Sequence, residues 1–500
     1  MTADTAVTET IGQQAGRGLR WSLIGTLITK AGSFAMGLVL ARLLAPADFG
    51  VYAIAIAATA VLMHINDVGL IAAVVQWRGR LEDMAPTAAT LAMLFASLIY
   101  GGFYLAAPAF ATAAGNASAT PVVRILALVI VIDGITAVRS GTLMRTFQQG
   151  RLMTANAVGL VANASVAITL AIGGAGPFSF AWGQVTGALV TGILVFTFGK
   201  VPFRYGLDRA VARRLLTFGV PLAASLGVEA VVTNIQFAII GHITGTVAVG
   251  FYLLAFNVAS WAQNTLGQAI RYVSVAGFSR LSEQHDSALS DGVQRSIPLM
   301  VLVVAPIVAL TAVLSKPLIS LLYGAQWAPA APVLRLLVGL TLVRMAIGLC
   351  MDALMGAGAT RATLWLNAGW AAVLIPSLWW ATQHGGIHGA AIAQTGIAVL
   401  VAVPLAAVAL RRSNVAVTPV AVALVRPLLA AVGAGLVAAL AAHFAGPYTF
   451  VQLAVGGTAG LLAYVPAAVP REQLRQWAAM AARRRNRAAT PALELELELD

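Results

Sequence analysis

Residues 18–41 read GLRWSLIGTLITKAGSFAMGLVLA, and residues 49–75 read FGVYAIAIAATAVLMHINDVGLIAAVV. Each stretch is apolar over the roughly 20 residues that a helix needs to cross about 30 Å of hydrocarbon. Similar stretches follow at 87–110, 121–139, 153–173, 178–199, 216–240, 247–270, 296–323, 333–355, 362–381, 387–409, 419–442 and 449–469. Ala, Gly and Leu dominate them without the alternation of an outer-membrane strand. The sequence therefore predicts an all-α, polytopic membrane protein of about fourteen transmembrane helices.

The composition supports the membrane assignment. Hydrophobic residues make up 59% of the 500 residues and charged residues only 10%, with a mean hydropathy of +0.86, whereas about 25% of a soluble domain is charged. The net charge of +13 does not indicate nucleic-acid binding, because the basic residues sit in short loops instead of clustering with aromatic residues on one face. Cys350 is the single cysteine of the sequence, so a disulfide framework is excluded. It lies in an apolar stretch.

Basic residues alternate between the loops, which predicts the topology. One set of loops holds Arg17, Arg20, Arg78, Arg80, Arg139, Arg145, Arg151, Lys200, Arg204, Arg209, Arg213, Arg214, Arg271, Arg280, Arg295, Arg361, Arg411 and Arg412. The opposite loops, at 111–120, 241–246 and 381–389, contain almost no Lys or Arg. Because cytoplasmic loops are enriched in Lys and Arg, we predict an even number of spans with both termini in the cytoplasm.

A short repeat predicts two lobes. The stretch FGVYAIA at 49–55 returns as VGFYLLA at 249–255, each time at the start of the second helix of a six-helix set. Two similar halves are what alternating access around a central site requires. We predict a cytoplasmic N-terminal segment at 1–17, an N-lobe at 18–199, a cytoplasmic linker at 200–215, a C-lobe at 216–410, two extra helices at 411–469 and a basic cytoplasmic tail at 470–500.

The residues that open the chain resemble the polysaccharide flippases. The shared pattern is ARLL at 41–44, Pro-x-x-Phe-Gly-x-Tyr at 46–52 and Asp-x-Gly-Leu at 67–70. The stretches GFYLLAFNVASW at 250–261 and VAGFSRLSEQHDS at 275–287 are similar to the second lobe of that family. The resemblance spans about residues 15–410 and points to the multidrug, oligosaccharidyl-lipid and polysaccharide exporter superfamily.

The resemblance implies a function and partners. Members of the polysaccharide branch move undecaprenyl-diphosphate-linked oligosaccharides from the cytoplasmic to the outer leaflet of the bacterial plasma membrane. It implies a secondary-type transporter and not an enzyme, with a proton or sodium as a coupling ion. Membrane lipids, a polysaccharide polymerase and glycosyltransferases are the partners that it implies, and nucleic acid is not among them.

Three ionisable residues stand near the middle of predicted spans: Lys30, Glu229 and Arg344. Each costs at least about 2.5–3.5 kcal/mol at that depth, so each is a candidate functional residue. Lys30 and Arg344 could neutralise a diphosphate, which requires fixed cations in a cavity of low dielectric constant. The alternative is that they form structural ion pairs within the helix bundle.

Glu229, Asn234 and Gln236 share the seventh predicted span, where Glu229 and Gln236 are two turns apart on one face. One hypothesis is that they line the central cavity, with Glu229 binding a coupling cation or exchanging a proton. The alternative is interhelical hydrogen bonding.

Five residues are weaker candidates for gating or ion coupling: His64, Asp67, Asp133, Arg271 and Asp352. His64 and Asp67 share a helix face, whereas Asp133 and Asp352 lie toward the cytoplasmic ends of their spans. Snorkelling or capping is the favoured explanation for Asp133, and contact with lipid head groups explains Arg271 as readily as contact with substrate does.

Several motifs are missing from the sequence. It contains no Gly-Lys-Ser/Thr phosphate loop, no His-Glu-x-x-His and no Cys-x-x-Cys, so we expect no ATP hydrolysis, no cofactor and no metal site. A cation-coupled multidrug exporter of the same superfamily stays an alternative, but it would favour an acidic cavity. A saccharide ligase or polymerase would need a larger outside loop.

The motif Gly183-x-x-x-Gly187 predicts close helix packing, and the alternating Leu and Glu of the C-terminus have no functional explanation.

Overall fold

The computed structural model describes residues 11–66, 74, 77, 80–146, 148–199, 204–263, 288–356, 360–413 and 415–469. The elements of these residues are helices, and no strand occurs among them, which confirms the all-α prediction. Eleven helical segments among them are long and apolar enough to cross a membrane. One of the eleven, Trp365–Arg412, has 48 residues, which is more than enough for two crossings. The total of about fourteen spans stays a prediction.

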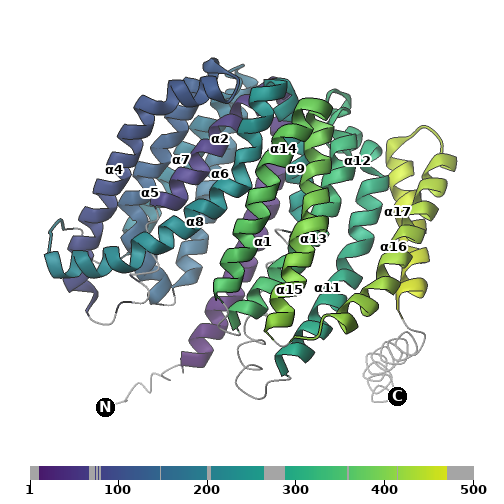
Figure 1. Ribbon diagram of the computed structural model, residues 1–500. Coiled ribbons are helices and arrows are strands. Elements are labelled where there is room, and N and C mark those ends of the chain that lie inside the picture. The colour runs from purple at the N-terminus through teal and green to yellow at the C-terminus, as the bar shows by residue number, and fades with distance from the viewer. Residues whose placement is uncertain are drawn as a thin grey trace, which may run out of the picture. The chain divides into compact units, whose positions relative to one another are not determined.

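The first half of the chain forms a regular series of long helices (Figure 1). They are α1 (Ile11–Leu43), α2 (Pro46–Asn66), α4 (Leu81–Ala113), the 3₁₀ turn η1 (Ala117–Ala119), α5 (Thr120–Arg145), α6 (Gln149–Ile172), α7 (Phe178–Phe198), α8 (Arg209–Thr244) and α9 (Thr246–Ala262). Polar caps begin two of them. The Asp48 carboxylate accepts a hydrogen bond from the Ala45 N–H (3.0 Å) beside the start of α2, and Asp208 accepts from Ala210 and Val211 at the start of α8.

The second half contains two interruptions, of which the one within 296–323 was not predicted from hydropathy and the one between 362–381 and 387–409 was. Its helices are α11 (Ala288–Val313), α12 (Ser315–Leu322), the 3₁₀ turn η3 (Ala325–Trp327), α13 (Ala330–Gly356), α14 (Thr360–Ile397), the π-helical turn η4 (Ala398–Ala402), α15 (Val403–Arg412), α16 (Thr418–Phe444) and α17 (Thr449–Ala468). The predicted span 296–323 is divided between α11 and α12, because Pro317 has no N–H to donate to the Val313 carbonyl. Gly386 (φ 56°, ψ −142°) interrupts α14 between the predicted spans 362–381 and 387–409.

The helices pack as two compact units. Unit 1 comprises Met1–Ala269, Leu322–Leu337 and Asn367–Val401, and unit 2 comprises Ile270–Leu321, Val338–Leu366 and Ala402–Asp500. Each unit combines three segments that are separate in the sequence. The predicted boundaries of two lobes, a linker and two extra helices therefore stay predictions.

The two halves of the chain share backbone features beyond the seven-residue repeat. Gly115 (φ 90°) precedes η1 and α5, and Gly324 (φ 101°) precedes η3 and α13. Gly176 (φ 54°) precedes α7, and Gly386 (φ 56°) precedes the last part of α14. Glycine adopts these positive φ angles without the steric cost that a Cβ imposes. The same two turns therefore recur in the same order.

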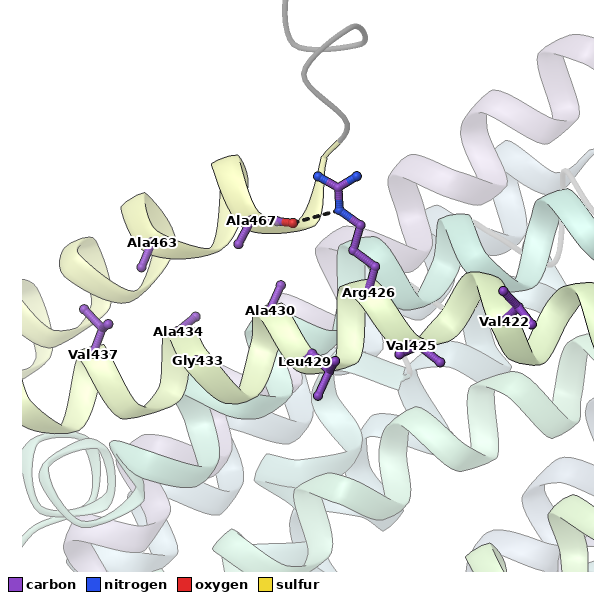
Figure 2. Close-up of a pocket in the computed structure, with 10 residues that line it drawn as sticks. All are labelled: Val422, Val425, Arg426, Leu429, Ala430, Gly433, Ala434, Val437, Ala463 and Ala467. Atoms are coloured by element: carbon purple, nitrogen blue, oxygen red, sulfur yellow. Dashed lines mark hydrogen bonds between the residues drawn. The ribbon is translucent and has the colours of Figure 1, made fainter.

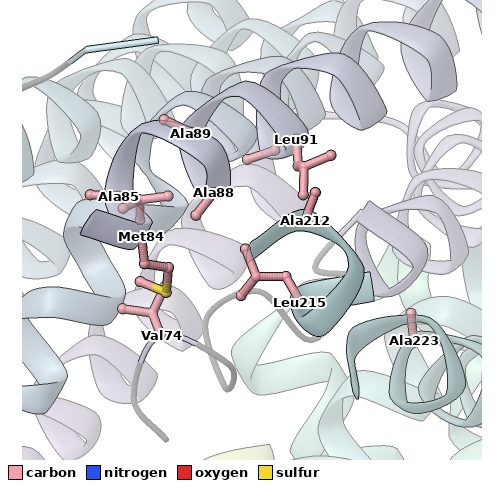
Figure 3. Close-up of a cluster of buried hydrophobic side chains, with 11 residues drawn as sticks. Val74, Met84, Ala85, Ala88, Ala89, Leu91, Ala212, Leu215 and Ala223 are labelled. Atoms are coloured by element: carbon pink, nitrogen blue, oxygen red, sulfur yellow. The ribbon is translucent and has the colours of Figure 1, made fainter. Parts of the chain in front are cut away.

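Small residues allow close packing within unit 1. A buried cluster joins the start of α4 to the start of α8, where Met84, Ala88 and Leu91 lie near Ala212 and Leu215 (Figure 3). Helices α6 and α7 pack closely along their length, as the predicted Gly183-x-x-x-Gly187 motif indicates. A Cβ on Gly183 would lie 2.8 Å from the Ala167 Cβ and 3.0 Å from the Asn163 carbonyl oxygen, so glycine permits this close approach.

Within unit 2, α16 and α17 lie side by side and pack against α11 (Figure 1). A Cβ on Gly460 of α17 would overlap the Leu310 side chain of α11. The Tyr464 hydroxyl donates a hydrogen bond to the Leu302 carbonyl of α11 (2.8 Å). The last two helices of the described chain are thus fixed to α11 by close contact and by a hydrogen bond.

Candidate functional site

A polar cavity of about 370 Å³ lies within unit 1, among helices α1, α5, α6 and α7. Its described lining consists of Thr29, Ser33, Val129, Asn156, Gly159, Leu160, Asn163, Gln184, Gly187, Ala188 and Thr191. Three amides and three hydroxyls are among these residues, and the described lining contains no ionisable side chain. Polar groups are costly at membrane depth, so six of them around one cavity indicate a binding function.

Two matched helix faces form most of this cavity. On α6, Asn156, Gly159 and Asn163 follow the spacing i, i+3, i+7, which places them on one face. On α7, Gln184, Gly187 and Thr191 follow the same spacing. Each helix therefore presents a glycine between two polar side chains.

The two central glycines bring α6 and α7 together. A Cβ on Gly159 would lie 2.8 Å from the Gly187 carbonyl oxygen, and a Cβ on Gly187 would lie 2.9 Å from the Gly159 carbonyl oxygen. Any larger residue at either position would push the helices apart. The polar side chains on both sides of this contact are thereby held close to one another.

Gln184 is held in place by an aromatic pair. Its Nε2 donates a hydrogen bond to the Tyr52 hydroxyl of α2 (2.6 Å). The Tyr52 ring stacks on Phe180, with ring centroids 4.2 Å apart and an interplanar angle of 11°. This contact restricts the rotamer of Gln184, so one wall of the cavity is preorganised.

Helix α1 brings a cation to the same depth. A Cβ on Gly25 would lie 2.6 Å from Met153 Cγ, and one on Gly32 would lie 2.7 Å from Leu160 Cδ2, so α1 and α6 run in parallel register. This register puts Lys30 at a depth between Asn156 and Asn163. Lys30 is half-buried, and with the described residues it forms no hydrogen bond or ion pair.

Gln236 belongs to a different polar cluster of unit 1. It is fully buried, and its side-chain oxygen accepts hydrogen bonds from the Tyr252 hydroxyl (2.9 Å) and from Gln394 Nε2 (2.7 Å). Its own Nε2 donates to the Thr233 carbonyl (2.8 Å). This placement favours the alternative of interhelical hydrogen bonding for Gln236.

Like Lys30, the other described candidates are not among the lining residues of this cavity. Asn234 is half-buried and donates to the Ala230 carbonyl of its own helix (2.9 Å). Asp133 is half-buried in α5. In unit 2, Arg344 is half-buried in α13, and Asp352 is 3% exposed about two turns further along the same helix.

Four predicted site positions fall partly or wholly outside the described part of the chain. Asp67 and Arg271 lie outside the described residues. Glu229 and His64 are helical residues of α8 and α2, but their side chains lie outside the described set. Among the described residues, no group of three His, Cys, Asp or Glu could hold a metal ion.

The amides of the polar cavity were not among the predicted site residues. A search for charged residues passes over Asn156, Asn163 and Gln184, since neutral amides cost less in a membrane than charges. The available signal was the spacing polar, Gly, polar on two consecutive predicted spans.

A second pocket, apolar and about 810 Å³, lies between α16 and α17 of unit 2 (Figure 2). Its lining is Val422, Val425, Arg426, Leu429, Ala430, Gly433, Ala434, Val437, Ala463 and Ala467. Figure 2 shows Arg426, the one charged residue among the described lining residues, donating to the Ala467 carbonyl (2.9 Å) near the end of α17. The pocket is thus apolar along most of its length and has a cation at one end.

Known proteins are similar to this chain in sequence and in fold. A succinoglycan biosynthesis transport protein, ExoT of Rhizobium meliloti, is 25% identical over 484 residues, covering 95% of this chain and 97% of that protein. The lipopolysaccharide biosynthesis protein WzxC of Escherichia coli is 23% identical over 335 residues, covering 65% and 67%. The lipid II flippase MurJ in an inward closed conformation superimposes with a TM-score of 0.72 at 11% identity, covering 89% and 98%, which shows a common fold.

The family assignment rests on a longer match than any single motif. Residues 39–332 match the family described as polysaccharide biosynthesis protein, which is more than half of the chain. The matched range includes the repeat at 49–55 and 249–255 and most of the polar cavity. The chain therefore belongs to the polysaccharide biosynthesis protein family, which confirms its resemblance to the polysaccharide flippases of the multidrug, oligosaccharidyl-lipid and polysaccharide exporter superfamily.

Proposed function

We propose that this protein moves a polyprenyl-diphosphate-linked oligosaccharide from the inner to the outer leaflet of the bacterial plasma membrane, for the synthesis of a cell-surface polysaccharide. The observation that carries the proposal is the half-buried Lys30 at the depth of a neutral polar cavity. A diphosphate needs a cation, whereas a saccharide needs neutral hydrogen-bonding groups. The full-length similarity to a succinoglycan transport protein supports the same cargo class.

We infer an alternating-access mechanism in which two similar halves open in turn to each side of the membrane. The repeated stretches at 49–55 and 249–255 and the recurrent glycine turns support this mechanism. The sequence has no nucleotide-binding loop, so a proton or sodium gradient or the membrane potential would supply the energy. The distribution of Lys and Arg supports cytoplasmic termini.

The predicted site residues have proposed roles in this mechanism. Lys30 of unit 1 would contact the diphosphate, and Arg344 of unit 2 is a separate candidate cation for it. Glu229 and Asn234 would act in ion coupling, whereas Gln236 would take part in it only if its buried hydrogen bonds are exchanged for the ion. His64, Asp67, Asp133, Arg271 and Asp352 would act in gating. Glycosyltransferases would supply the lipid-linked saccharide, and a polymerase would consume it.

The apolar pocket between α16 and α17 suits the lipid end of such a cargo. Its described lining is aliphatic apart from Arg426, whose hydrogen bonds go to the Ala467 and Val469 carbonyls. An isoprenoid chain offers only apolar surface, so it gains from burial in such a lining and loses no hydrogen bonds.

A multidrug exporter of cationic compounds is the second candidate, because a multidrug transporter of the superfamily superimposes with a TM-score of 0.62 at 14% identity. Acidic side chains would be expected to bind a cationic drug. The described lining of the polar cavity has amides and hydroxyls in their place, which favours the flippase.

The test is reconstitution of the purified protein into liposomes that contain a fluorescent polyprenyl-diphosphate saccharide. Transfer between leaflets is measured by the loss of fluorescence to an impermeant quencher, with and without an ion gradient. We expect faster transfer than in protein-free liposomes. Absence of transfer, together with gradient-driven uptake of a cationic dye, would establish the exporter instead.

A further inference from the structure

We propose that the neutral polar cavity of unit 1 is a saccharide subsite, which binds the sugar attached directly to the diphosphate. The inference rests on the proposed function and names the part of the cargo that this cavity recognises. It separates two tasks, with Lys30 for the phosphate and the amides of α6 and α7 for the sugar.

The chemistry of the lining matches a sugar and not a phosphate. A sugar hydroxyl both donates and accepts hydrogen bonds, and so do the amides of Asn156, Asn163 and Gln184. A diphosphate only accepts hydrogen bonds and carries charge that a neutral lining does not compensate. The absence of ionisable groups from the described lining also favours a neutral sugar over a uronic acid.

The amides are available for a ligand. Among the described residues, neither Asn156 nor Asn163 has a hydrogen-bonding partner for its side chain. Both are half-buried and flank the middle of α6, where a polar group without a partner is costly. Hydrogen bonds to a sugar would remove that cost.

Close contacts hold two walls of the cavity, which is small and open on one side. Contact between Gly159 and Gly187 fixes the distance between its two main walls, and the bond to Tyr52 fixes Gln184. A volume of about 370 Å³ is near the lower end of the roughly 300–1,000 Å³ of ligand cavities. The cavity thus holds a small part of an oligosaccharide instead of the whole chain.

The register of α1 against α6 selects which sugar is bound. Lys30 follows Thr29, which lines the cavity, and lies at a depth between Asn156 and Asn163. One residue adds only about 1.5 Å along a helix, so Lys30 lies at the depth of the cavity, although it is not among the described lining residues. A diphosphate beside Lys30 would place its first sugar at the cavity.

The test is a binding measurement on the full-length protein in detergent, with two probes. One probe is polyprenyl diphosphate alone, and the other is polyprenyl diphosphate that carries a single neutral hexose. We expect the wild-type protein to bind the glycosylated probe about tenfold more tightly, because it gains several hydrogen bonds. Asn156→Ala and Asn163→Ala should each weaken that probe about two- to tenfold and leave the bare probe unchanged.

Two further variants complete the design. Thr169→Ala removes an exposed polar side chain of α6 that is not in the cavity lining, and it should bind both probes like the wild type. Lys30→Ala should weaken both probes equally. Because Asn163 packs against Gly187 while Asn156 does not, the Asn156 variant tests the subsite without disturbing that contact.

The outcomes separate the two proposals. If both asparagine variants weaken both probes equally, or weaken neither, the saccharide subsite is wrong although the flippase stands. If the wild-type protein binds neither probe, the proposed function itself is wrong. A preference for the glycosylated probe that both asparagine variants abolish would establish the subsite.

Discussion

Gly250 of α9 packs directly against the backbone of α2 at Gly50, and the contact is reciprocal. A Cβ on Gly250 would lie 3.1 Å from the Gly50 backbone nitrogen and would overlap the Pro46 carbonyl. A Cβ on Gly50 would overlap the Thr246 carbonyl. Pro46 and Thr246 occupy the same place in the two copies of the repeat, so one sequence motif forms both sides of a helix crossing.

Substitution at this crossing should destabilise the protein. In Gly50→Ala and in Gly250→Ala, the new methyl group meets backbone atoms that cannot rotate away, so α2 and α9 must separate. We expect each variant to lose about 1–3 kcal/mol of stability, measured as a lower midpoint of thermal unfolding in detergent.

Gly101→Ala is the matched control for this prediction. Gly101 lies within α4, and a Cβ there would have no atom within 4 Å. The control should unfold at the wild-type temperature or slightly above it, since alanine favours helix. If all three variants unfolded at the same temperature, the crossing of α2 and α9 would not be tightly packed.

A second prediction concerns the interruption of α14. Gly386 has φ 56° and ψ −142°, a conformation that side chains with a Cβ rarely adopt. Gly386→Ala should therefore cost about 1–3 kcal/mol through backbone strain, although the nearest atom to the new Cβ would be 3.9 Å away. Thermal unfolding measures the loss.

The neighbouring residue supplies the control. Gly385 has no positive φ angle, and a Cβ there would meet nothing within 4 Å. Gly385→Ala should melt like the wild type. If both substitutions proved neutral, the two segments of α14 would be joined by a more permissive turn than the structure has.

Much of this fold could be predicted from the sequence, for a physical reason. Hydrophobic length sets the positions of membrane helices, and the short repeat at 49–55 and 249–255 marks equivalent helices in two halves. The break before α12 could not be located in the same way, because residues 296–323 are apolar on average and the effect of Pro317 depends on one missing N–H.

The candidate site was less predictable than the fold. Lys30 stands out in any sequence because a charge in a membrane span is expensive. Asn156 and Gln184 become a site only when α6 and α7 pack in the register that Gly159 and Gly187 set. That register is a tertiary property, and the sequence of either helix alone does not give it.

A third prediction tests whether Gln236 is structural. Gln236→Leu removes the acceptor of two buried hydrogen bonds, from Tyr252 and from Gln394, and leaves both donors without that partner. We expect a loss of about 1–3 kcal/mol in stability. Tyr252→Phe should cost less, about 0.6–1.7 kcal/mol, because Gln394 still donates to Gln236.

Transport measured beside stability separates the two roles of Gln236. If it acts only in the cluster, the remaining folded Gln236→Leu protein transports the lipid-linked saccharide at the wild-type rate. A stable variant with greatly reduced transport would show that Gln236 contacts cargo or a coupling ion. Tyr448→Phe, at a tyrosine that is 73% exposed, controls Tyr252→Phe for removal of a phenol hydroxyl.

The last prediction concerns Lys30, whose half-buried ammonium lies at the depth of the polar cavity. Lys30→Ala should reduce the rate of leaflet transfer in liposomes at least about tenfold, because a charge-assisted hydrogen bond to phosphate contributes roughly 1.5–3 kcal/mol. Lys30→Arg keeps the cation and should retain most of the rate.

Lys316→Ala removes an exposed lysine of α12 and should transport like the wild type. Because Lys30 is a half-buried charge with no partner among the described residues, its removal favours folding, and Lys30→Ala should unfold at the same temperature as the wild type or above it. A variant that melts early and transports slowly would instead indicate that Lys30 holds the bundle together, and the diphosphate would then need another cation, for which Arg344→Ala is the corresponding test.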